Sequence, residues 1–250
     1  LNPWKYVNGL AAAASRAGAK IYANSEVINW TREGDKHILV TPRGRVKANK
    51  VLMATAAYTS EDLHPDYGGR IMPAISSIVV TRPMNQNELG AQGWTNTTPV
   101  YDIRYLLHYF RLLPDGRMMF GGRGGLSAEP GAIDRQLGNI EAAFRAYYPE
   151  WRHVEITHRW SGLLCLAQDL VPHVGSWDDE PGVYYAMCYH GNGVAMGTWS
   201  GRAAARAMVG GVEERPNFIR RPPPKFPLPF LRPLYLRGAY VTYGIKDALK

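Results

Sequence analysis

The chain has 250 residues, of which 46% are hydrophobic and 20% are charged, and its formal net charge is +8 at pH 7. That composition excludes a disordered or collagen-like chain, and no apolar run reaches the roughly 18 residues that a membrane-spanning helix needs. The N-terminus lacks the pattern of a secretory leader. The only two cysteines, Cys165 and Cys188, lie in apolar contexts, which argues against a disulfide framework and favours a cytoplasmic location.

The first part of the chain predicts one helix followed by short strands. Apolar residues recur at helical spacing over 3–17, with Pro3 in the first turn and Gly18 at the end. β-prone runs follow at Lys20–Tyr22, Glu26–Thr31, His37–Thr41 and Arg45–Thr55. Since residues 50–55 are apolar at successive positions, they predict a strand that is covered on both faces, as in a layered α/β domain.

After Gly69 the apolar residues alternate over longer runs, which predicts extended strands of an antiparallel sheet. Pro114-Asp115-Gly116 predicts a hairpin, because Pro presets one turn angle and Gly supplies the positive one. The expected elements are strands at Ala74–Arg82, Tyr105–Leu113, Arg117–Gly121, His153–Leu164 and Gly182–Tyr189, and helices at Ile133–Tyr147 and Gly193–Val209.

Residues 213–250 form a basic, proline-rich tail. Its prolines, at 216, 222–224, 227, 229 and 233, are too many for a packed helix or a central strand, so an extended course is expected. Such charge suits an acidic partner, a membrane surface, nucleic acid or plain solvation, and selects none of them. The basic residues are Arg215, Arg220, Arg221, Lys225, Arg232, Arg237, Lys246 and Lys250.

The sharpest local motif is His190-Gly191-Asn192-Gly193-Val194-Ala195, between a buried strand and a small-residue helix. Glycines allow close approach of a ligand, and the first N–H groups of a helix favour negative charge. Such a turn suits the edge of a reduced flavin, although a simple tight connection would also use it. By contrast, residues 121–125 (GGRGG) fit no phosphate loop and predict a flexible turn beside a site.

Four blocks of the chain, in order, resemble the FAD-dependent D-amino-acid oxidase (DAO) superfamily. They are Pro3–Leu10 through Val27, Val51–Tyr58, Pro114–Arg123, and Arg159–Gly175 continuing into the turn and helix at 190–201. The tail at 226–250 resembles the extension of gamma-glutamylputrescine oxidoreductase-like members. The family's N-terminal dinucleotide-binding segment, its opening βαβ fingerprint, is missing.

The resemblance implies an α/β (α+β) fold with a discontinuous, incomplete FAD/NAD(P)-binding domain at 1–70 and 155–212. A substrate domain with a mixed, largely antiparallel sheet is expected at 71–154. The cofactor would be non-covalent FAD, because the family's flavin-linking cysteine would fall near Gly162. Its expected contacts are Val27, Ala54, Thr55, Ala56, Trp160, Gly162, Gly191, Asn192, Gly193, Val194 and Ala195. Tyr109, Arg123 and His190 are expected to bind substrate, His190 is the one catalytic candidate, and no metal site is expected.

The implied reaction oxidises the CH–NH bond of an amine or amino acid, such as a gamma-glutamylputrescine-like compound, to an imine. Oxygen or another acceptor would then reoxidise the flavin. The expected partner is a small-molecule amine, with no nucleic acid and no integral membrane segment; the oligomeric state stays open. Without the missing segment the chain is expected to be inactive alone. The alternatives are a non-catalytic fragment and a binding module that acts through the basic tail.

Overall fold

The computed structural model describes residues 1–94, 96–125, 129–177, 179–211 and 216–249. It divides the chain into two compact units, each built from separated stretches of sequence. Unit 1 comprises Leu1–Gly68 and Asp169–Pro224, and unit 2 comprises Gly69–Gln168 and Lys225–Lys250. Every helix among the described residues is too short or too polar to cross a membrane.

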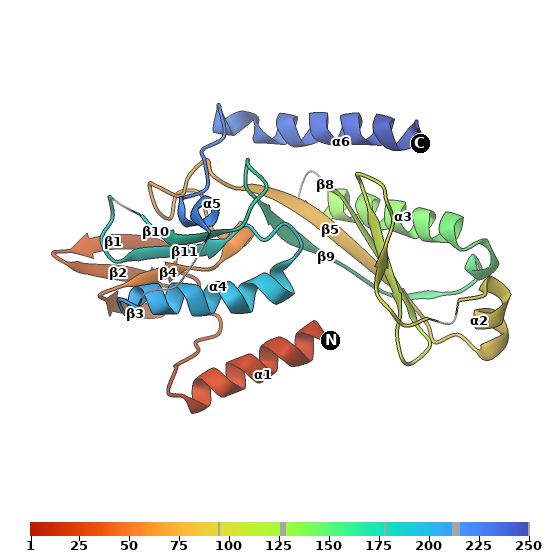
Figure 1. The fold of residues 1–250 in the computed structure, drawn as a ribbon, viewed down its shortest axis with the longest axis horizontal. Helices are drawn as coiled ribbons and strands as arrows, with labels where there is room; N and C mark the ends of the chain where they lie inside the picture. The colour runs from red at the N-terminus through yellow and green to blue at the C-terminus, as the bar shows by residue number, and fades with distance from the viewer. Residues whose placement is uncertain (95, 126–128, 178, 212–215, 250) are drawn as a thin grey trace. The chain divides into compact units, whose positions relative to one another are not determined.

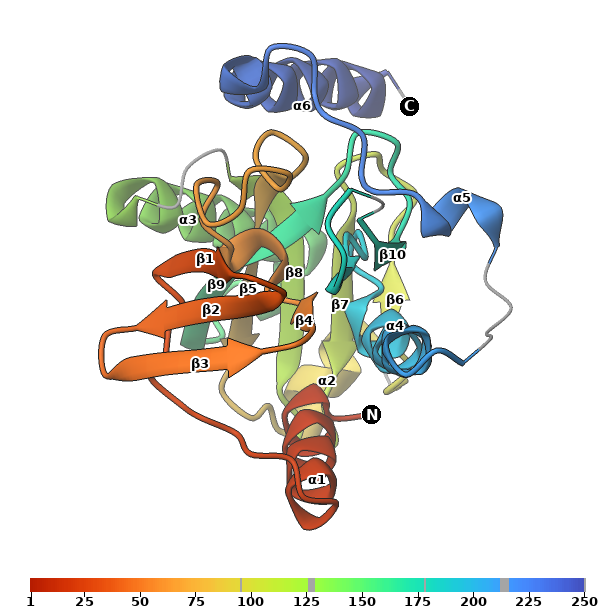
Figure 2. The same ribbon diagram turned by 90° about the vertical axis from the view of Figure 1, so that its left-hand side faces the viewer.

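Unit 1 holds two small sheets (Figures 1 and 2). β1, β2 and β3 form an antiparallel meander, while β4 and β11 run parallel in a second sheet of order β10-β11-β4. α4 packs closely on this second sheet because its buried residues Ala203 and Ala204 are small. The elements are α1 (Pro3–Arg16), β1 (Asn29–Glu33), β2 (Lys36–Thr41), β3 (Gly44–Ala48), β4 (Val51–Met53), η1 (Ala56–Tyr58), β10 (His173–Ser176), β11 (Val183–Met187), α4 (Gly193–Met208) and α5 (Asn217–Arg220).

Unit 2 is built on one antiparallel sheet of order β6-β7-β8-β5-β9. Its main core lies between this sheet and α3, where Phe120, Phe144 and Trp151 are fully buried. The elements are β5 (Met72–Thr81), α2 (Gln86–Gln92), β6 (Val100–Tyr101), β7 (His108–Leu112), β8 (Met118–Gly125), α3 (Pro130–Tyr147), η2 (Pro149–Trp151), β9 (Ile156–Leu166), η3 (Pro229–Leu231) and α6 (Arg232–Ala248).

The two faces of the unit 2 sheet have different surroundings. Successive residues of a strand point to opposite faces, and directly paired residues point to the same one. Val79 faces α3, whereas Ala74 packs against Leu236 of α6. We call this second side the α6 face. Tyr109 of β7 and Arg123 of β8, two of the three residues expected to bind substrate, lie on it.

Several expectations from the sequence are confirmed. The fold is mixed α/β with a largely antiparallel sheet in unit 2. The helix expected over 3–17 is α1, with Pro3 in its first turn, and Asn2 caps it by accepting from the Lys5 N–H at 3.1 Å. The hairpin at 114–116 also forms, with Gly116 at φ +80° and its N–H donating to the Leu113 carbonyl.

Four local expectations were wrong. No strand forms at Lys20–Tyr22, and the run Arg45–Thr55 is split into β3 and β4. Residues 121–125 are not a flexible turn but the end of β8, where Ser76 of β5 pairs with Arg123. The boundary expected at 155 falls later, because β9 pairs with β5 along almost its whole length and so belongs to unit 2.

The tail is not extended throughout. Residues 232–248 form α6, in which Pro233 occupies the first turn, the one part of a helix where proline costs little. Phe226 donates its N–H to the Gly69 carbonyl at 2.9 Å, so the segment before the helix is fixed to unit 2. Among the expected basic residues, Arg215 and Lys250 lie outside the described residues.

Candidate functional site

Two of the expected cofactor segments lie at the same edge of a sheet in unit 1. β4 and β11 run parallel, with Val51 opposite Val183 and Met53 opposite Tyr185. Their carboxyl ends therefore lie side by side, and residues 54–56 leave one strand where residues 188–192 leave the other. Ligands of open α/β sheets bind at the carboxyl ends of the strands. Ala54 and Thr55 are both exposed there, so their backbone is accessible to a ligand.

The 54–56 segment is held by bonds to its own neighbourhood. Ala56 has φ +50°, an unusual conformation for a residue with a side chain. Its carbonyl accepts from the Tyr67 hydroxyl at 2.6 Å and from the Thr59 hydroxyl at 3.1 Å. Thr59 also hydrogen-bonds the Thr55 hydroxyl. This network fixes the course of the backbone just after β4.

The turn after β11 is conformationally strained and ends at an uncapped helix. Cys188, His190 and Gly191 have φ values of +66°, +52° and +104°. Strain of this kind in residues other than glycine is concentrated at functional sites. Asn192 precedes α4 but its side chain makes no capping hydrogen bond, so the first N–H groups of the helix, from Gly193 on, are not capped by it. That helix start suits an anionic or electron-rich group.

An apolar cavity of about 470 Å³ lies beside this helix start. Gly193 and Val194 form one wall, and Trp4, Val7 and Leu10 of α1 form another. α1 has no buried residue, and a side-chain hydrogen bond to α4 joins the Tyr6 and Thr198 hydroxyls at 2.7 Å. The expected contacts Gly193 and Val194 thus border a hollow that would accept a flat apolar group.

Val27 borders a second cavity of unit 1, of about 730 Å³. The half-buried Val27 lies in the segment that leads into β1, and the cavity is also lined by Lys20, Arg43 and Arg45. The Arg43 guanidinium donates to the Ala23 carbonyl at 3.4 Å, which ties this arginine to the same segment. Basic side chains around an apolar floor suit a ligand that carries phosphate.

The ring of His190 makes a bond within unit 1. Its Nε2 atom lies 3.3 Å from the Val171 carbonyl oxygen, and since a carbonyl only accepts, Nε2 carries the proton in that bond. The contact orients the ring beside the strained turn. In this tautomer Nδ1 carries the lone pair, so the bond to Val171 fixes the orientation of the ring and determines which nitrogen is basic.

The expected residues of unit 2 share one face of its sheet. Ser76 pairs with both Arg123 and Gly162, and Ile78 pairs with Gly121 and Trp160, so all six lie on the α6 face. Trp160 is 45% exposed there. Gly121 has no side chain on this face, which leaves room for the Tyr109 ring. A Cβ at this position would lie 2.5 Å from that ring.

Tyr109 completes this surface. It pairs with Gly121, and its hydroxyl lies 2.6 Å from that of Ser76. Burial raises the pKa of the Tyr109 hydroxyl, an effect that the Ser76 bond and the charge of Arg123 partly offset. The phenol is therefore neutral at pH 7 and able to donate a hydrogen bond. Tyr109, Arg123, Trp160 and Gly162 are brought together here, whereas the residues expected around the flavin turn belong to unit 1.

Two residues of the α6 face were missed by sequence reasoning. Ser76 lies in a plain alternating strand, which carries no chemical signal by itself. Tyr240 lies in α6, where residues 234–249 contain no proline and Leu236, Tyr240 and Tyr243 recur at helical spacing. That spacing was the signal that the proline-rich start of the tail obscured.

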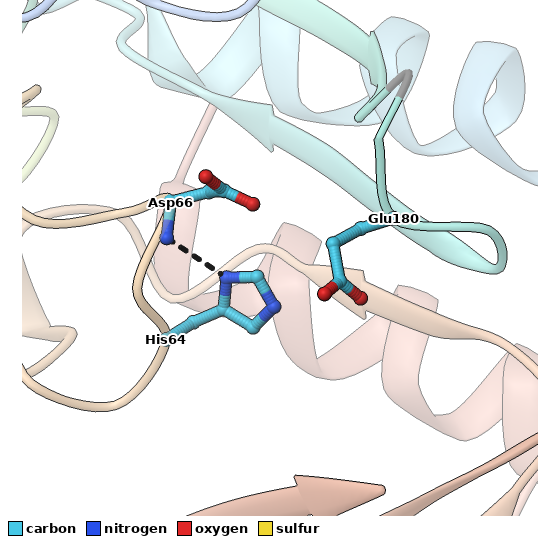
Figure 3. Close-up of side chains that lie close together, drawn as sticks. All are labelled: His64, Asp66 and Glu180. Carbon is cyan, nitrogen blue, oxygen red and sulfur yellow. Dashed lines mark hydrogen bonds between the residues drawn. The ribbon is translucent and has the colours of Figure 1, made fainter. Parts of the chain in front are cut away.

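Three potential metal ligands lie together in unit 1, although none was expected (Figure 3). The ligand atoms of His64, Asp66 and Glu180 lie within 4.8 Å of one another. The Asp66 N–H donates to Nδ1 of His64 at 3.3 Å, so the proton of the neutral ring is on Nε2, the nitrogen that a metal would need bare. Glu180 also pairs with Arg32 at 3.3 Å. We assign these residues to hydrogen bonding and not to a metal site.

Burial keeps the ring of this cluster neutral. It lowers the pKa of His64, against the raising effect of the Glu180 and Asp66 charges. The ring of Trp30 packs on it at a centroid distance of 4.5 Å. An aromatic neighbour at this distance fits a structural histidine that joins the segment after η1 to the loop at Glu180.

Comparison with known proteins identifies a family. The sequence model of the FAD dependent oxidoreductase family (DAO) matches residues 1–207. A probable oxidoreductase OrdL of Haemophilus influenzae is 30% identical over 84% of this chain and 47% of its own length. Gamma-glutamylputrescine oxidoreductase of Escherichia coli is 27% identical over 100% of this chain and 57% of its own length. The chain thus spans about half the length of these relatives.

Solved structures agree on the fold. An L-proline dehydrogenase from P. horikoshii superposes with a TM-score of 0.70 at 20% identity, covering 94% of this chain and 60% of that one. A glycine oxidase from Geobacillus kaustophilus gives a TM-score of 0.66 at 20% identity, with 83% and 54% covered. At these identities the likeness concerns the fold alone.

Proposed function

Because the chain belongs to the family of FAD-dependent oxidoreductases, we propose that it forms the flavin-ring and substrate parts of an enzyme that oxidises a CH–NH bond. The substrate would be an amine or amino acid, and the product an imine that water hydrolyses. Bound FAD would accept the hydride. The expected cofactor, FAD, agrees with the dependence of the family on it.

One observation carries the proposal: the loops after β4 and β11 leave adjacent parallel strands at the same sheet edge, next to the start of α4. The exposed backbone at Ala54 and Thr55 would approach the elongated part of the cofactor. The helix start at Gly193 would direct N–H groups toward the electron-rich edge of the flavin. In this scheme unit 1 holds the cofactor, and the α6 face of unit 2 binds the substrate.

The finer proposal is a substrate that resembles gamma-glutamylputrescine. It is supported by coverage: the Escherichia coli relative matches 100% of this chain, including the tail beyond residue 207. The Geobacillus kaustophilus glycine oxidase matches 78% of this chain. A substrate site that includes part of the tail would therefore resemble that of the Escherichia coli relative more than that of the glycine oxidase.

The test is anaerobic flavin bleaching in the full-length protein. Amines and amino acids, gamma-glutamylputrescine among them, are added to the FAD-loaded protein, and loss of the yellow absorbance marks hydride transfer. The proposal expects bleaching by at least one CH–NH compound. A protein that holds FAD but is bleached by none of them contradicts the proposed reaction, and one that binds no FAD contradicts the cofactor assignment.

A matched pair of variants tests the turn itself. Gly191→Ala forces a side chain into φ +104°, and should reduce FAD affinity by distorting the path into α4. Gly201→Ala is the control, because Gly201 lies within α4 and a Cβ added there meets no atom within 4 Å. Equal FAD retention in both variants would mean that the turn does not contact the cofactor.

A further inference from the structure

α6 has one side that packs on the rest of unit 2. Leu236 is buried in a cluster with Ala74 of β5, and Tyr240, about one turn later, packs against the same cluster. Tyr243 stacks on Tyr105 at a centroid distance of 5.4 Å. Since residues three and four positions apart lie on one side of a helix, the opposite side of α6 faces away from these contacts.

The opposite side of α6 is an exposed row of aliphatic residues. Leu234, Val241 and Ile245 are each more than half exposed, and they recur at helical spacing. Leu249 follows at the end of the helix and is also more than half exposed. We call these four residues the outer stripe. Because folded proteins rarely expose large contiguous apolar patches, a row of this length marks an interaction surface.

The charges on this side of the helix are positive. Helical geometry places Arg237 on one flank of the outer stripe and Lys246 on the other, and both residues are exposed. The ammonium group of Lys246 also lies 5.3 Å from the centre of the Tyr105 ring. The one acidic residue in the sequence between positions 225 and 249 is Asp247. Its side chain is fully buried and accepts backbone N–H bonds of 2.8 and 3.0 Å from the loop before β7. Over its described residues, the outer side of α6 therefore combines aliphatic groups with cations and presents no carboxylate.

Both ends of α6 are fixed within unit 2, so the outer stripe is held in one orientation. At its end, the buried carboxylate holds the loop before β7. At its start, the Arg232 guanidinium donates to the Ile71 carbonyl, and the Tyr235 hydroxyl donates to the Pro227 carbonyl at 2.8 Å. Phe230, just before the helix, is exposed and adds an aromatic ring at this end. Aromatic side chains are enriched at the boundary between water and lipid.

Two occupants suit an aliphatic stripe of this kind: a second copy of the chain and a lipid surface. A symmetric pair would bring each stripe onto its own copy, together with Arg237 and Lys246 of both copies. Like charges that meet in this way oppose association, and the formal net charge of +8 adds to the repulsion. An anionic bilayer attracts the same cations and takes up the aliphatic groups at its interface. The charges therefore favour the lipid surface.

We propose that the outer stripe of α6 binds the surface of an anionic membrane, with the helix lying in the plane of the interface. The aliphatic side chains enter the boundary between headgroups and acyl chains, while Arg237 and Lys246 stay at the level of the lipid phosphates. This attachment needs no helix that spans the membrane. It does not depend on the proposed reaction, because none of its residues is assigned to the flavin or the substrate.

Sedimentation with lipid vesicles tests the attachment. The full-length protein is mixed with vesicles of phosphatidylcholine alone, or of equal parts phosphatidylcholine and phosphatidylglycerol, and the bound fraction is measured after centrifugation. The proposal expects binding to the anionic vesicles that weakens as salt is added, and little binding to the neutral ones. Equal binding to both kinds of vesicle, or binding to neither, overturns it.

A matched pair of substitutions locates the binding surface. Val241→Glu places a carboxylate in the outer stripe and should weaken binding to the anionic vesicles roughly tenfold. Val209→Glu makes the same change at an exposed position of unit 1, directly after α4, and should leave the affinity close to that of the unmodified protein. Since both positions are exposed, both variants should melt within a few degrees of the unmodified protein. Equal affinities in the two variants overturn the proposal.

Arg237→Gln tests the electrostatic part separately, and it decides if Val241→Glu is too unstable to compare. One cation near an anionic surface contributes roughly a factor of five to binding. A loss of that size supports the proposal, and an unchanged affinity overturns it. A dimer in size-exclusion chromatography that Val241→Glu dissociates, in a protein that binds no vesicles, would make the stripe an interface between copies and would overturn the membrane assignment.

Discussion

Glu88 allows the ion-pair energetics of unit 2 to be tested by one substitution. Its carboxylate accepts two hydrogen bonds from the Arg82 guanidinium, at 2.6 and 2.9 Å, and one from the Asn85 N–H at 3.0 Å. Asn85 in turn accepts from the Glu88 N–H at 2.9 Å, which completes a capping box at the start of α2. These bonds favour the ionised carboxyl and lower the pKa of Glu88 to about 2.

The size of the effect follows from linkage. A carboxyl whose pKa falls from 4.5 to about 2 on folding would stabilise the native state by about 3 kcal/mol. The Arg82 side chain is 35% exposed, so solvent screening reduces this to about 1–2 kcal/mol. Because the folded pKa is the lower one, the contribution is fully present above pH 4.5 and is lost as the pH falls toward 2.

Glu88→Gln keeps an oxygen for the Asn85 N–H and removes the charge, so it isolates the ion pair. Urea unfolding at pH 7 should show a loss of about 1–2 kcal/mol, and the loss should shrink to roughly half by pH 3. Asp134→Asn, at an exposed position of α3, is the control and should show little loss at either pH. A Glu88→Gln loss that is the same at both pH values would refute the electrostatic account.

Three further substitutions probe the two units. Gly121→Ala would bring a methyl group to 2.5 Å from the Tyr109 ring, and should cost about 1–3 kcal/mol in urea unfolding. Gly175→Ala would bring a methyl group to 2.5 Å from the Tyr185 hydroxyl, and should lower the melting temperature. Tyr67→Phe removes the 2.6 Å bond to the Ala56 carbonyl and should cost about 1 kcal/mol; undiminished FAD affinity would show that this bond does not shape the cofactor loop.

Local signals predicted the local structure well. Pro3 and the apolar spacing after it gave the first helix, and Pro114-Asp115-Gly116 gave the hairpin, because each depends only on neighbouring residues. The tail was predicted less well, because its proline content alone does not show which prolines lie within a helix. Only Pro233 falls inside α6, in the turn that tolerates it, and the others precede the helix.

The surface around Arg123 depends on information that is not local. Its side chain faces the same way as Ser76 because the two residues pair at the end of a ladder that runs without a shift from Val80 and Met119. A shift of one residue in the register would turn every side chain of a strand to the other face of the sheet. No periodicity in the sequence determines that register. The family resemblance indicated Tyr109, Arg123 and Trp160 as separate candidate site residues. The strand pairing shows that they lie on the same face of the sheet.

The pairing of β5 with β9 has a consequence for how the chain folds. β4 and β11 must meet across a long intervening stretch, and the entropy lost in closing a loop rises with its length. Met72 pairs with Leu166 near the two ends of that stretch, so a folded unit 2 already draws those ends together. Once unit 2 has formed, only a short loop has to close for β4 and β11 to pair. These two strands, which lead into the candidate cofactor loops, can therefore assemble last.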